Sequence, residues 1–134
     1  MDWSSIEAPT IDEFEALARK AFSSLPKAFR GLCEGVAMRI EEFPDEEVSA
    51  EMGLESPFEL TGLYQGVGLT RKSGDEIAPL PDMIFLYRRS ILDEWAEGGT
   101  SLGELVRHIL IHEIGHHFGL SDEDMHAIED GAEG

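Results

Sequence analysis

The chain has 134 residues, of which 28 are acidic and 10 basic, and its formal net charge is −18 at pH 7. This length accommodates one hydrophobic core, so we expect a single domain over residues 1–134. The negative charge repels phosphate backbones, and we expect no nucleic-acid partner. No apolar run approaches the roughly 20 residues of a membrane helix, and the N-terminus lacks the pattern of a secretory signal. We therefore expect no membrane partner and a cytoplasmic location, with which the single cysteine, Cys33, is compatible.

The first half of the chain predicts one amphipathic helix followed by strands. A capping box of Thr10 and Glu13 begins a helix over residues 11–23, whose apolar side chains recur on one stripe. Residues 36–43 alternate between apolar and polar side chains, which is typical of a strand. Residues 61–70 are apolar and interrupted by glycines, which favours a strand or one arm of a hairpin.

Two segments between these elements are predicted to be irregular. The acidic run at residues 45–47 and the following residues 49–57 indicate a solvated loop. Residues 72–81 are polar, and Ser73-Gly74-Asp75 indicate the tip of a turn.

The second half predicts one short strand and three helices. The strand covers residues 83–87, and a short helix follows over residues 90–97. A second capping box, Ser101 with Glu104, begins a long helix that ends near Phe118. A last helix is expected from Ser121 to Ile128, before a frayed tail at residues 129–134. The sequence therefore predicts an α+β fold, with a small mixed sheet, an N-terminal helix and a long helix near the C-terminus.

The long helix carries two histidines at the spacing of metal ligands. His112 and His116 are four residues apart, so both rings leave the same face of the helix, one turn from each other. Glu113 lies about 100° around the helix, too far to be an obvious ligand but well placed to hydrogen-bond a metal-bound water as general base. Gly119 is placed to reverse the chain by a left-handed turn, which lets Asp122 return towards the two rings.

Two histidines and a carboxylate would bind one Zn²⁺ ion and leave a fourth position for water, as catalytic zinc requires. His126 is a rival for the third ligand, and Glu123 and Asp124 are weaker ones. His108 shares the stripe of His112 but lies too far from His116 for all three to meet one ion, so we expect a supporting role. His117 projects away from His116 and is expected to be solvated or to pair with Glu113.

The motif His-Glu-x-x-His-x-x-Gly-x-x-Asp at residues 112–122 resembles the metzincin signature, in the variant with aspartate as the third ligand. The whole chain is similar to a bacterial family of minimal metzincin-like zinc metallopeptidase domains. The similarity also includes Leu25-Pro26, Glu42-Phe43-Pro44 and the segments at residues 60–66 and 81–89. It implies a single-domain zincin-like fold, ligands His112, His116 and Asp122, and Glu113 as the acid/base. Metzincins also keep a methionine below the metal, and Met125 is the only methionine downstream.

The leading hypothesis is a zinc metallopeptidase, acting on a peptide or protein through metal-bound water with Glu113 as general base. The alternative is a zinc-binding regulatory or interaction domain with little or no peptidase turnover. A metal-dependent ribonuclease is disfavoured, because Asp122 stands where such a family has a third histidine and the net charge opposes RNA binding.

Overall fold

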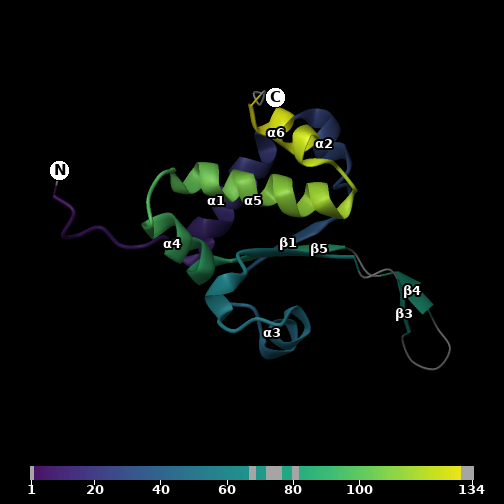
Figure 1. The fold of residues 1–134 in the computed structure, drawn as a ribbon, viewed down its shortest axis with the longest axis horizontal. Coiled ribbons are helices and arrows are strands. Elements are labelled where there is room, and N and C mark those ends of the chain that lie inside the picture. Colours follow the sequence, from purple (N-terminus) through teal and green to yellow (C-terminus); the bar gives the residue numbers. More distant parts are fainter. Residues whose placement is uncertain (1, 67–68, 72–76, 80–81, 131–134) are drawn as a thin grey trace.

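The computed structural model describes residues 2–66, 69–71, 77–79 and 82–130 (Figure 1). Its elements follow in the order α1 (Ile11–Ser23), α2 (Lys27–Gly31), β1 (Ala37–Glu41), α3 (Glu46–Met52), the 3-10 turn η1 (Pro57–Glu59), β2 (Gly62–Gln65), β3 (Leu69–Arg71), β4 (Ile77–Pro79), β5 (Met83–Tyr87), α4 (Arg88–Ala96), α5 (Leu102–His117) and α6 (Asp122–Asp130). The predicted α+β class is confirmed. None of the helices in these residues is long and apolar enough to cross a membrane.

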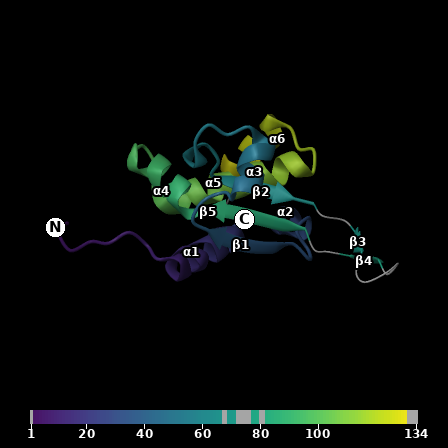
Figure 2. The same cartoon turned by 90° about the horizontal axis from the view of Figure 1, so that it is seen from below.

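A mixed sheet of three strands supports the long helix α5. The strand order is β1-β5-β2, with β1 parallel and β2 antiparallel to the central strand β5. The register pairs Ala37 with Met83 and Gly62 with Leu86. Strand β2 therefore occupies one edge of this sheet (Figure 2). The short strands β3 and β4 pair with each other in a separate two-stranded sheet and project away from the body of the molecule (Figure 1).

Helices α1 and α5 lie together on one side of the sheet, and α3 lies on the other side (Figures 1 and 2). The apolar core is formed by α1, α5 and the sheet, and its fully buried side chains include Phe14 and Ala18 of α1, Leu86 of β5, and Leu110 and Ile111 of α5. Complete burial of a large apolar side chain contributes about 1.5–3 kcal/mol, so this layer is the main source of stability.

Both predicted capping boxes are present. The backbone N–H of Glu13 donates to Thr10 Oγ1 at 3.1 Å, and Glu13 Oε1 accepts from the backbone N–H of Thr10 at 2.9 Å. Ser101 and Glu104 make the same exchange at the start of α5. These short-range bonds satisfy amide donors that a helix cannot satisfy itself, and for that reason the sequence located both boundaries.

The prediction of a loop over residues 45–57 was wrong in its first part. Asp45 accepts a hydrogen bond from the backbone N–H of Val48 at 2.8 Å and begins α3. Gly53, with φ of 66°, ends it. Helix α3 buries none of its side chains, so it has no apolar stripe from which a helix could be predicted. Caps and acidic residues in the first turn stabilise it instead.

Other boundaries also differ from the prediction, and β1 covers only Ala37–Glu41 of the expected residues 36–43. Helix α4 begins at Arg88, two residues early, and the segment at residues 61–70 contains β2 and the start of β3. Residues 129 and 130 belong to α6, so only residues 131–134 of the expected tail remain, and they lie outside the described residues. The expected turn tip, Ser73-Gly74-Asp75, also lies outside the described residues.

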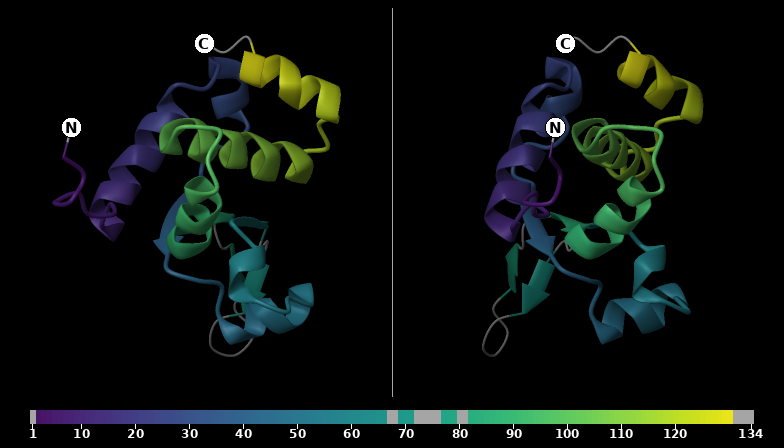
Figure 3. Two further views of the ribbon diagram at one scale, coloured as in Figure 1. Left: turned by 60° about the vertical axis from the view of Figure 1, so that its left-hand side comes forward. Right: turned by 90° about the vertical axis from the view of Figure 1, so that its left-hand side faces the viewer.

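The chain reverses between α5 and α6 at Gly119, as predicted. Gly119 has φ of 77°, its N–H donates to His116 O, and the N–H of Leu120 donates to Gly115 O at 2.9 Å. This is the Schellman arrangement, in which a left-handed residue lets the last carbonyls of a helix be satisfied. Helix α6 then runs back beside α5 (Figures 1 and 3).

The two helices approach closely because α5 has a glycine at the contact. Met125 of α6 is fully buried, and a Cβ atom on Gly115 would overlap its Sδ atom and lie 2.8 Å from its Cγ atom. Gly115 therefore sets how near α6 can come to α5.

Replacing Gly115 with alanine is expected to lower the free energy of unfolding by about 1–3 kcal/mol, because Met125 must move out of a filled core. Gly103→Ala on the same helix is the matched control, since a Cβ there would lie 3.9 Å from Leu17 and overlap nothing. That control should be neutral or more stable by up to about 1 kcal/mol. Urea denaturation measures both, and equal effects of the two substitutions would contradict the close contact.

Candidate metal centre

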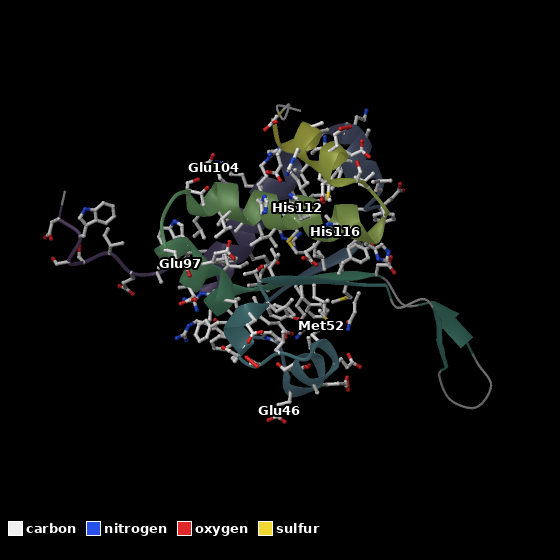
Figure 4. The ribbon with its side chains drawn as sticks, in the orientation of Figure 1. Glu46, Met52, Glu97, Glu104, His112 and His116 are labelled. Atoms are coloured by element: carbon white, nitrogen blue, oxygen red, sulfur yellow. The ribbon has the colours of Figure 1, made fainter. Side chains whose placement is uncertain are left out.

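Three histidines line the side of α5 that lies next to α6. His108, His112 and His116 follow one another at intervals of four residues, so each ring stands one turn from the next. The ring centroids of His108 and His112 are 4.2 Å apart, and those of His112 and His116 are 5.8 Å apart. Figure 4 shows His112 and His116 on α5, beside α6.

Helix α6 places polar groups opposite these rings. Its residues at positions 122, 126 and 129 are four and three apart, so they share one helical face. We call the combined set the α5–α6 ladder; its members are His108, His112, His116, Asp122, His126 and Glu129. Because α6 runs back along α5, the ladder pairs His116 with Asp122 at one end and His108 with Glu129 at the other.

His112 lies at the centre of the ladder and is bound to Glu129. The distance from His112 Nε2 to Glu129 Oε1 is 2.6 Å, and His108 Nδ1 lies 2.9 Å from the same oxygen. Burial opposes ionisation of Glu129, but the hydrogen bonds to His108 and His112 outweigh it and lower the pKa of this carboxyl. Glu129 is therefore a carboxylate that both imidazoles share. The ring of His126 is 6.2 Å from that of His112.

The predicted ligands are not all drawn together in the described structure. Asp122 Oδ1 approaches His116 Nε2 to 3.8 Å, while the Nε2 atom of His112 is turned to Glu129. Within the described parts of the chain, the donor set whose atoms all lie within 4.8 Å of one another is His108, His112 and Glu129. The ligand set His112, His116 and Asp122 thus stays a prediction.

Sequence reasoning missed Glu129, because it assigned residues 129–134 to a frayed tail. One signal was available: Glu129 lies seven residues after Asp122, so on a continuous helix both carboxylates face the same way. His108, for which we expect a supporting role, contacts Glu129 through Nδ1 at 2.9 Å, and that role stays a prediction.

Glu113 points away from the ladder, towards the edge strand β2. A Cβ atom on Gly62 would lie 3.3 Å from Glu113 Cγ, so the glycine makes room for the Glu113 side chain. The backbone N–H of Tyr64 lies close enough to this carboxylate to lower its pKa. Burial raises the pKa of Glu113, and the nearby His116 and the Tyr64 amide only partly offset it. A carboxylate in this setting is a stronger base than an exposed one.

His117 belongs to a different cluster from the one expected. It stacks on Tyr64 with ring centroids 3.9 Å apart, and its Nε2 atom lies 3.9 Å from Asp82 Oδ2. The Tyr64 hydroxyl donates to the same Asp82 oxygen at 2.9 Å. His117 contacts Tyr64 and Asp82 rather than Glu113, although Glu113, one turn earlier, leaves α5 on the same face. The side chain of His117 is 35% exposed, so the expectation that His117 is solvated is compatible with the structure. The cluster joins the end of α5 to β2.

Comparison with known proteins bears on this arrangement. Residues 33–132 match the model of a family described as Zincin-like metallopeptidase. The chain belongs to the zincin-like metallopeptidase family. No curated protein matches the chain.

A solved structure supports the fold of the zincin-like chain. It is similar to a conserved hypothetical protein from Thermo thermophilus, with 26% identity and a TM-score of 0.54. The match covers 81% of this chain and 94% of that chain. The similarity therefore extends over most of both chains and includes the α+β layers.

Membership of the zincin-like family implies zinc binding, and the donor chemistry of the ladder fits that metal. Zn²⁺ prefers imidazole nitrogen and carboxylate oxygen at about 2.0–2.2 Å, and the ladder consists of these two donor types alone. Two donors on one tetrahedral ion lie about 3.3 Å apart. The distance from His116 Nε2 to Asp122 Oδ1 is slightly longer, at 3.8 Å, and the distance from His112 Nε2 to Glu129 Oε1 is slightly shorter, at 2.6 Å.

Replacing Tyr64 with phenylalanine is expected to lower the free energy of unfolding by about 0.5–1.5 kcal/mol, because the bond to Asp82 is lost while the stack on His117 remains. Tyr64→Leu removes the stack as well and should cost more. Urea denaturation compares the two, and a phenylalanine variant as stable as the native chain would contradict a stabilising role of this bond.

Proposed function

We propose that the protein is a metzincin-like zinc metallopeptidase that hydrolyses peptide bonds, with His112, His116 and Asp122 as zinc ligands and Glu113 as general base. The observation that carries this proposal is the division of α5 into two functional faces. His112 and His116 face the carboxylates of α6, while Glu113 faces the open edge of the sheet. A peptide at that edge would lie beside both the base and the predicted ligands.

The ligand assignment requires one rearrangement. His112 must leave Glu129 and turn its Nε2 atom towards the His116–Asp122 pair, which is already 3.8 Å apart. Asp122 is 83% exposed, so its side chain is free to rotate. Met125 packs beneath this part of α5, against Gly115, which supports the similarity to metzincins. A zinc ion held there supplies a Lewis acid that polarises a carbonyl and makes water more acidic.

Glu113 is the residue that moves the proton. In its ionised form it accepts a proton from the attacking water and then passes it to the leaving amine, as general acid–base catalysis requires. Its raised pKa suits both steps, since a base that is too weak cannot take the proton. The Glu113 side chain passes Gly62 of β2, and we place the peptide along this strand.

The edge strand β2 is better placed than β5 to bind a peptide, because β5 is paired on both sides. The N–H of Tyr87 donates to Thr61 O, so in the alternating pattern of antiparallel strands Gly62 and Tyr64 direct their backbone groups outward. An extended peptide could add to this edge as a further strand. Its scissile bond would then lie near Glu113.

Glu113→Gln is expected to retain zinc and to lower kcat by about 10²–10⁴-fold, because the amide cannot accept the proton of the water. Glu104→Gln, at the start of the same helix, is the control that changes the charge of α5 equally. Digestion of a peptide library followed by kinetics on one cleaved peptide provides the measurement. Hydrolysis at the native rate in the glutamine variant would remove Glu113 as the base.

A zinc-binding regulatory domain is the second candidate, and the ladder itself favours it. The ladder joins α5 to α6, so an ion bound between them would stabilise the fold. Zinc at 100 times its Kd would add about 2.7 kcal/mol, and chelation should therefore lower Tm. A large Tm shift with no cleavage of any library peptide would support the binding domain over the peptidase.

A further inference from the structure

We propose that His108, His112 and Glu129 form a second zinc-binding station, which shares His112 with the motif site and holds the ion away from Glu113. This inference goes beyond the proposed peptidase site and needs only the three side chains that the fold brings together. Their donor atoms lie within 4.8 Å of one another in the described structure.

The geometry of this station is close to that of a bound ion. His108 Nδ1 and His112 Nε2 both lie close to Glu129 Oε1, at 2.9 and 2.6 Å. Donors on a tetrahedral zinc ion stand about 3.3 Å apart, so the carboxylate has to retreat by less than about 1 Å to admit the ion. Glu129 lies near the end of α6, and a small rotation of its side chain supplies this movement.

The station is open to solvent on one side and enclosed on the other. The side chain of His108 is 50% exposed, whereas those of His112 and Glu129 are 19% and 24% exposed. A hydrated ion can therefore meet His108 first and exchange its waters for the two inner donors. The carboxylate supplies the negative charge that compensates the ion, and the surrounding chain is acidic as well.

The two stations exclude each other. A neutral imidazole has one unprotonated nitrogen, so His112 Nε2 can bind only one ion at a time. The motif site uses the turn of α5 after His112, and the second station uses the turn before it. His116 lies close enough to Glu113 to lower its pKa, so the second station holds the ion on the side of His112 away from the histidine nearest the general base. The chain then has a zinc-loaded form that does not hydrolyse peptides, and rotation of His112 interconverts the two forms.

The test removes each station separately and measures zinc affinity by competition with a chromophoric chelator. His116→Ala with Asp122→Asn removes the motif site, and His112→Ala removes both stations. The first variant should bind one zinc per chain about tenfold or more tightly than the second. Adding His108→Ala and Glu129→Gln to it should reduce its affinity to that of His112→Ala. His117→Gln is the control, because it removes an imidazole of α5 that lies outside the ladder.

A direct readout comes from the imidazole nitrogen signals of the variant without the motif site. Zinc is expected to shift Nδ1 of His108 and Nε2 of His112 and to leave His126 unchanged. The proposal is overturned if that variant, folded by circular dichroism, binds zinc no better than His112→Ala, or if loss of His108 and Glu129 leaves its affinity unchanged. Failure of the peptidase proposal looks different, since His116→Ala with Asp122→Asn would then leave the zinc affinity of the native chain unaltered.

Discussion

The reversal of the chain between α5 and α6 is the constraint on which the site depends. It is made by two glycines with different physical roles. Gly119 adopts a left-handed conformation, which closes the end of α5 and turns the chain back. Gly115 leaves the space that buried Met125 occupies, so α6 can lie against α5. Together they place the carboxylates of α6 beside the histidines of α5.

Helix α5 carries two kinds of chemistry because its residues leave it in different directions. The histidines at intervals of four residues form a row along one face, while Glu113, a single residue later than His112, emerges about 100° away. That angle sends Glu113 to the edge strand, where Gly62 makes room for it and the nearby Tyr64 amide lowers its pKa. A base and a row of ligands are thereby fixed on one rigid element, with the core of the protein packed behind both.

His112 belongs to two alternative sets of metal donors. In the described structure its Nε2 atom is bound to Glu129, whereas the motif assigns the same residue to the pair formed by His116 and Asp122. Both carboxylates belong to α6, so one helix offers His112 a partner at each end. The match to the zincin-like family model, residues 33–132, includes the segment of the motif. Glu129 supplies an additional carboxylate, because α6 continues past the motif to Asp130.

The sequence by itself determined those features that depend on contacts within a few residues. It located α1 and α5 from capping boxes and apolar stripes, the reversal from Gly119, and the histidine pair from its spacing. It missed α3, whose side chains are all at least partly exposed and leave no stripe. Only the tertiary structure decided that Glu129 reaches His112 and that His117 stacks on Tyr64. These contacts join residues 17 and 53 positions apart, and their formation depends on how helices and sheet pack, which no local pattern encodes.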